Sequence, residues 1–134
     1  MIVQLLNSLR LFLASHRWVG LLWSAIILVL CLVPSSGIPR TPVIPFFDKI
    51  VHMGIFAIWS FTWTGHYRRR RAIILLTGIG LGLLIEFLQE AMKMGRSFEW
   101  LDLVADATGA LAGILLYGFL YREPTAGKPP GRFS

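Results

Sequence analysis

Charged residues are scarce in this chain. Only 15% of its 134 residues are charged and 55% are hydrophobic, whereas an ordinary soluble domain has about 25% charged residues. A soluble domain of this length could not bury so much apolar surface, because small domains hide only a limited fraction of what they expose. Lipid removes that difficulty, so the composition favours a membrane protein.

Cysteine is nearly absent. Cys31 is the only one, so no internal disulfide can form, and no Cys/His spacing typical of a metal site surrounds it. We also find no serine or cysteine nucleophile motif, since Ser97 follows Arg96 but has no local base. The sequence therefore predicts no cofactor and no bound metal, and Cys31 is interpreted as a small buried hydrophobic residue.

Acidic residues are also few, seven against 13 lysines and arginines, which gives a net charge of +6. A basic chain can indicate nucleic-acid binding. Here, however, the basic residues separate apolar runs instead of lining one polar face. The positive-inside bias of membrane proteins explains this pattern better, so we expect no nucleic-acid partner.

Four apolar runs are long enough, or nearly so, to cross a hydrocarbon core that takes about 20 residues. They cover residues 18–33, 46–66, 72–92 and 101–121. Residues 2–14 precede them with apolar positions at i, i+3 and i+4, which predicts an interfacial helix. The expected fold class is all-α: a polytopic membrane protein with about four transmembrane helices in one domain, residues 1–121. Residues 122–134 are rich in Pro, Gly and charge, which predicts a flexible tail.

The basic residues also predict the orientation. If the N-terminus is inside, nine of the 13 lysines and arginines fall on the inner side and four on the outer side. The inner group includes the run Arg68 to Arg71. Because short inner loops carry the excess of Lys and Arg, both termini are expected in the cytoplasm, with the chain in a bacterial inner membrane.

Most acidic residues fall at the outer end in this orientation. Three helix ends each present polar residues at i, i+4 spacing, on one helical face: Asp48 with His52, Glu86 with Glu90 and neighbouring Gln89, and Asp102 with Asp106. Lys49 and Arg96 are the nearby cations. A carboxyl group inside the core costs several kcal/mol unless it is paired, protonated or hydrated. These side chains should therefore converge around a cavity that opens outward.

Small residues recur every four positions in the last two runs, as Gly78 and Gly82 and as Ala105, Gly109 and Gly113. Such stripes allow close approach of membrane helices. We expect them to bring residues 72–92 and 101–121 together, with Glu86 near Asp106.

Three strings carry a resemblance to a known family: Asp48-Lys49-Ile50-Val51-His52, Glu86-Phe87-Leu88-Gln89, and the stretch from Gly95-Arg96 through Asp102 and Asp106 to Gly113. Over residues 20–121 they resemble the VanZ-like family of bacterial membrane proteins. The resemblance implies a four- or five-helix inner-membrane protein, and the namesake of the family is linked to resistance to the glycopeptide teicoplanin. Family members usually carry asparagine where this chain has Asp106. A hydrogen bond made by that amide would need a protonated Asp106 or a neighbouring cation here.

The first functional hypothesis is binding of a lipid-linked envelope precursor or a glycopeptide-type ligand at the outer face, among membrane lipids. The expected ligand-binding residues are Asp48, Lys49, His52, Glu86, Gln89, Arg96, Asp102 and Asp106. The second hypothesis is an intramembrane enzyme acting on such a lipid, with Glu86 or His52 as acid or base and Arg96 as the phosphate partner. The third is a small proton-linked transporter, with a homo-oligomer left open because four helices make a narrow bundle.

Structural explanations stand beside these hypotheses. Asp48 and His52 could brace one helix, Glu86 could pair with Arg96 or Lys49, and Arg96 could bridge Asp102 and Asp106. A metal held by His52, Glu86 and the two aspartates is chemically feasible, but nothing in the spacing requires it.

Overall fold

The structure is a computed structural model that describes residues 1–33, 46–92 and 98–122. It contains helices α1 (Ile2–Ser15), α2 (Arg17–Cys31), α3 (Phe47–His66), α4 (Arg71–Ala91) and α5 (Trp100–Leu120). These described segments include no strand, which agrees with the all-α prediction. Each predicted run forms a helix whose ends lie within two residues of the prediction. The predicted tail, beyond Arg122, lies outside the described residues.

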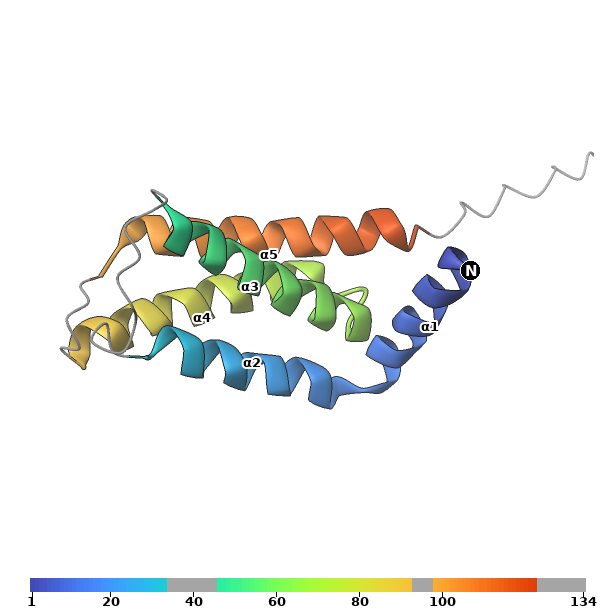
Figure 1. The fold of residues 1–134 in the computed structure, drawn as a ribbon, viewed down its shortest axis with the longest axis horizontal. Coiled ribbons are helices and arrows are strands. Elements are labelled where there is room, and N and C mark those ends of the chain that lie inside the picture. The colour runs from blue at the N-terminus through green and yellow to red at the C-terminus, as the bar shows by residue number, and fades with distance from the viewer. Residues whose placement is uncertain (34–45, 93–97, 123–134) are drawn as a thin grey trace, which may run out of the picture.

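Helices α2 to α5 run lengthwise in a bundle, and α1 lies across one end of it (Figure 1). We call the end where α3 and α5 begin and α4 finishes the polar end. The opposite end, where the Arg68–Arg71 run joins α3 to α4, is the arginine end. Helix α3 contacts all four other helices, and its most extensive contact is with α5. Helix α3 is therefore the central element of the bundle.

The glycine stripe of α5 lies against α3. A Cβ atom built on Gly109 would collide with the carbonyl oxygen of Met53, and one on Gly113 with that of Ala57. The prediction that this stripe contacts α4 is therefore wrong in part, because a small-residue stripe marks a close contact without specifying the partner helix. The stripe of α4 does face α5, since a Cβ on Gly82 would lie 2.7 Å from Asp106 Oδ2.

An apolar core joins α2 to α5. Its buried members include Ile27 and Cys31 of α2, Phe56 of α3, Ile85 of α4 and Ile114 of α5. Two tryptophans connect α2 to α3 by hydrogen bonds. Trp23 Nε1 donates to the Ile55 carbonyl oxygen, and Trp59 Nε1 donates to Ser24 Oγ, both at 2.9 Å. The indole N–H groups are thus satisfied within the bundle, as buried polar groups require.

Helix α1 is bent from α2 by 82° at His16. Its one buried residue, Leu13, packs on Gly65 near the end of α3, where a Cβ would lie 2.8 Å from Leu13 Cβ. Ile2, Val3 and Leu5 of α1 are exposed. The arrangement suits a helix that lies along an interface with its apolar residues outside the bundle.

Two helices, α4 and α5, are long and apolar enough to cross a membrane, and the bent pair of α1 and α2 raises the count to three if it forms one span. The described chain is therefore a helical membrane protein with two to three candidate spans by length and composition. Helix α2, with 15 residues, is short for a span, and α3 has polar residues over much of its length.

Candidate functional site

Lys49, in the first turn of α3, is the cationic centre of the polar end. Its Nζ lies 2.6 Å from Asp48 Oδ2 and 2.5 Å from Asp102 Oδ1, and it also pairs with Glu99. Asp48 and Glu99 have half-exposed side chains, whereas Asp102 is buried. The lysine therefore links the start of α3 to the start of α5 and compensates the one buried carboxylate among its partners.

One helical turn deeper, His52 joins α3 to α5 again. Its Nδ1 lies 2.9 Å from Asp106 Oδ1, and its Nε2 lies 3.9 Å from Asp102 Oδ2. Asp106 is completely buried and His52 is 4% exposed. A carboxylate that accepts a hydrogen bond from a ring nitrogen fixes the orientation of the imidazole, as in acid–base and metal sites.

Helix α4 contributes Glu86, which is also completely buried. Its Oε2 accepts a 2.8 Å hydrogen bond from the backbone N–H of Glu99, the residue just before α5. A carboxylate at this place accepts a hydrogen bond from one of the free N–H groups at a helix start. Its negative charge is also stabilised by the positive end of the helix dipole. Glu86 therefore ties the end of α4 to the beginning of α5.

Three buried carboxyl oxygens have no hydrogen-bond partner in the described part of the chain: Oε1 of Glu86, Oδ1 of Asp102 and Oδ2 of Asp106. Asp102 Oδ1 forms an ion pair with Lys49, which leaves those of Glu86 and Asp106 with neither a hydrogen bond nor an ion pair among these residues. A buried acceptor left unpaired costs about 1–3 kcal/mol, and more if it is charged. Such groups are rare in native proteins, so each one marks a place where a donor, a proton or a ligand belongs.

We call the residues that meet here the polar cluster: Asp48, Lys49, His52, Glu86, Glu99, Asp102 and Asp106. Glu99 was not among the predicted site residues. Its position three residues before Asp102, just ahead of a helix start, was the available signal.

Two predicted site residues fall outside this group. Gln89 is buried, but its Nε2 donates a 2.6 Å hydrogen bond to the carbonyl oxygen of Cys31 and so joins α4 to α2. Arg96 lies outside the described residues, and so do the predicted pairs that involve it. Glu86 does not pair with Lys49; it accepts the N–H of Glu99 instead.

Three carboxylates, those of Asp48, Glu99 and Asp102, offer oxygens within 4.8 Å of one another, close enough to hold a metal ion. The ammonium group of Lys49 pairs with all three. A cation is thus already supplied by the chain itself, and nothing in this arrangement requires a metal.

A helical membrane bundle with ionisable side chains turned inward at one end is the class of protein that this fold and cluster define. A family model described as VanZ/LLP1 matches residues 2–121. The match covers most of the chain, so the protein belongs to the VanZ/LLP1 family. Comparison with curated proteins and with solved structures yields no match.

Proposed function

We propose that this protein binds a lipid-linked envelope precursor or a glycopeptide-type ligand through the polar cluster, at the outer face of the bacterial inner membrane. Resistance to an antibiotic or to envelope stress would be the biological result. The proposal includes four membrane spans, α2 to α5, with both termini in the cytoplasm. The polar end then faces outward.

The four-span arrangement is supported by the position of α3. This helix carries Asp48, Lys49 and His52 near its start and buried Ser60, Thr62 and Thr64 further on. Because α3 packs against every other helix, its buried polar residues face protein and not lipid. A central helix can therefore span a membrane at lower hydropathy than α4 or α5, which have more lipid to face.

The observation that carries the binding proposal is the pair of unpaired oxygens on Glu86 and Asp106. Both belong to completely buried side chains, and they come from adjacent helices. Acceptors without donors in a dry environment bind N–H or O–H groups strongly. The ligand should therefore present hydrogen-bond donors, such as the amine or hydroxyl groups of a peptide or sugar head group.

Charge balance favours the same kind of ligand. The polar cluster holds five carboxyl groups but only one lysine and one histidine. Unpaired negative charge in a membrane is costly and is reduced by a proton or by a bound cation. A head group that carries an amine would contribute part of the missing positive charge, whereas a bare phosphate would be repelled.

Acid–base catalysis is a second candidate, and the His52–Asp106 pair favours it. A histidine held at 2.9 Å by a buried carboxylate has the arrangement of a general base with its orienting group. Glu86 would then act as the acid. Transport has less support, because the hydroxyls of Ser60, Thr62 and Thr64 donate to carbonyl oxygens of α3 itself and form no polar path between helices.

The test compares Glu86→Gln with Glu90→Gln, because Glu90 is an exposed carboxylate one turn further along the same helix. Each protein is purified in nanodiscs made from the expressing membrane, and retained lipids and glycolipids are identified by mass spectrometry. We expect Glu86→Gln to lower retention of one amine- or hydroxyl-rich species by about ten-fold, as for a lost bond to a charged acceptor. Glu90→Gln should retain it.

Equal retention of every species by the wild type and both variants would overturn the binding proposal. Retention of a chemically altered lipid by Glu86→Gln alone would favour the enzyme instead. In either case, expression of the wild type and of Glu86→Gln under teicoplanin shows separately whether resistance depends on this carboxyl group.

A further inference from the structure

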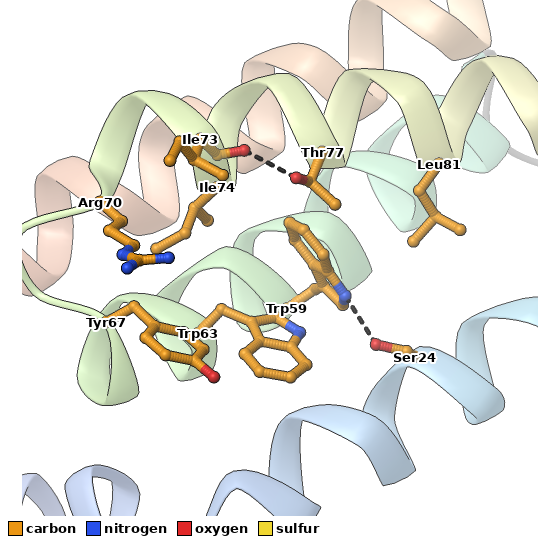
Figure 2. Close-up of a pocket in the computed structure, with 9 residues that line it drawn as sticks. All are labelled: Ser24, Trp59, Trp63, Tyr67, Arg70, Ile73, Ile74, Thr77 and Leu81. Atoms are coloured by element: carbon orange, nitrogen blue, oxygen red, sulfur yellow. Dashed lines mark hydrogen bonds between the residues drawn. The ribbon is translucent and has the colours of Figure 1, made fainter.

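A cleft lies toward the other end of the molecule, away from the polar cluster. It has a volume of about 430 Å³ and opens between α2 and α4, with one face of α3 as its floor. The floor is formed by Trp59, Trp63 and Tyr67, which recur every four residues (Figure 2). Ser24 of α2 lines one side, and the opposite wall is formed by Arg70 and by α4 as far as Leu81.

Most of the cleft wall is apolar, although Trp63 Nε1 has no hydrogen-bond partner among the described residues. Two other polar groups of the wall are satisfied within the chain. Trp59 Nε1 donates to Ser24 Oγ at 2.9 Å, and Thr77 Oγ1 donates to the Ile73 carbonyl oxygen at 2.8 Å (Figure 2). What remains facing the cleft is mainly ring faces and the aliphatic side chains of Ile74 and Leu81. Such a surface suits a hydrocarbon chain.

Polar groups are concentrated at the mouth, which lies at the arginine end. The guanidinium carbon of Arg70 lies 6.0 Å from the centre of the Tyr67 ring, and that ring stacks on Trp63 at 5.9 Å. A cation held over an aromatic face loses less freedom when it binds an anion. No carboxyl group in the described segments forms an ion pair with Arg70, so its charge is available to a ligand.

The length of the cleft fits one leaflet of a bilayer. Leu81 of α4 follows Arg70, the residue just before that helix, by 11 positions, which corresponds to a rise of about 16 Å. That distance is about half of a hydrocarbon core of roughly 30 Å. In the proposed span arrangement the charged mouth falls at the level of lipid head groups, and Leu81 lies near the bilayer centre.

We propose that this cleft binds one anionic phospholipid of the inner leaflet. An acyl chain lies along Trp59, Ile74 and Leu81, and the phosphate of the head group contacts Arg70. Charge complementarity selects the occupant, because the arginine run at the mouth attracts an anionic head group, and basic pockets between membrane helices on the cytoplasmic side bind such lipids. The inner-leaflet position rests on the orientation given under the proposed function, but the proposal does not depend on the function of the polar cluster.

The test uses the full chain in nanodiscs of phosphatidylcholine with a small fraction of phosphatidylglycerol. Native mass spectrometry counts the lipids of each kind retained after gentle release. Wild type should retain one phosphatidylglycerol in preference to phosphatidylcholine. Arg70→Gln should lower that preference by about five-fold, as for the loss of one basic contact. Arg69→Gln is the matched control, since Arg69 is exposed in the same run but does not line the cleft.

A second pair of variants tests the apolar part. Thr77→Trp places an indole in the cleft and should remove the retained lipid, whereas Leu76→Trp places it on an exposed neighbouring position of α4 outside the cleft and should not. Equal losses for Arg70→Gln and Arg69→Gln, or equal retention of the two lipids by wild type, would overturn the proposal. So would unchanged retention in Thr77→Trp.

Discussion

The two ends of the bundle use charge in opposite ways. At the polar end, Glu86, Asp102 and Asp106 are buried and turned toward other helices. At the arginine end, Arg69, Arg70 and Arg71 are exposed. Burial of a charge costs free energy that a fold recovers only through partners, whereas an exposed charge near a membrane surface costs little. The inward residues are therefore the ones whose presence calls for a functional explanation.

The same contrast separates two kinds of specificity. In setting the orientation of the chain, exposed arginines act by their number and by the field they create, so one can replace another. The buried polar residues act by position, since His52 reaches Asp106 and Lys49 reaches Asp102 only from one turn of α3. Substitutions at the arginine end should therefore have cumulative effects on orientation, whereas each substitution at the polar end should have its own effect on stability.

The largest effect is expected from removing the whole arginine run. Replacement of Arg68, Arg69, Arg70 and Arg71 by Gln takes away four of the nine basic residues on the proposed inner side and leaves five against four. The orientation signal then nearly vanishes, and a mixed orientation should result. Fusions of alkaline phosphatase and of a fluorescent protein to the C-terminus report it.

The matched control replaces the same four residues by Lys, which preserves charge and should preserve one orientation. A single orientation in the four-Gln variant would show that the run does not set the topology. The explanation that the arginines act together through their number and their electrostatic field would then be wrong.

The next effect is expected from Lys49→Met. Asp102 is 4% exposed, so loss of the ammonium leaves a buried carboxylate without its cation, which costs about 3 kcal/mol of unfolding free energy. Equilibrium unfolding in mixed detergent micelles, followed by circular dichroism, measures the loss. Arg69→Met, at an exposed position, should change stability by no more than about 0.5 kcal/mol.

Lys49→Arg offers a further check, because it keeps the charge and should recover most of the stability. Similar losses in Lys49→Met and Arg69→Met would contradict the distinction between the two ends.

The smallest effect is expected from Asp106→Asn, the residue that the family resemblance implies at this position. The amide oxygen can still accept the hydrogen bond from His52, so stability should change by less than about 1 kcal/mol. Asp106→Leu removes the acceptor and should cost about 1–3 kcal/mol in the same unfolding assay. A loss in Asp106→Asn as large as that in Asp106→Leu would show that the charge, and not the hydrogen bond, stabilises the pair.

The sequence predicted the helices closely because long apolar runs end where charge or proline begins. It also predicted which helix ends carry the polar residues, since i, i+4 spacing places Asp48 and His52, or Asp102 and Asp106, on one helical face. Both inferences use only distances along a single helix. The structure places these ends together, so local periodicity was sufficient for this much of the site.

Which neighbouring helix each residue contacts could not be predicted in the same way. Gln89 lies beside Glu86 in sequence, yet it faces the end of α2, because positions three apart on a helix diverge by about 60°. The Gly109 and Gly113 stripe contacts α3, although a small-residue stripe fits any neighbouring helix equally well. Glu99 belongs to the polar cluster although it lies outside the apolar runs, where most of the predicted site residues lie. These outcomes depend on how the helices pack around α3, which no single segment encodes.

The hydrogen bond from the Glu99 backbone N–H to Glu86 has a consequence for measurement. The amide that opens α5 is held by a side chain of another helix, so its exchange with solvent hydrogen and its nitrogen chemical shift respond to whatever happens at that carboxyl group. An isotope label on one backbone nitrogen would therefore detect an event at the buried acid directly, without a probe attached to the protein.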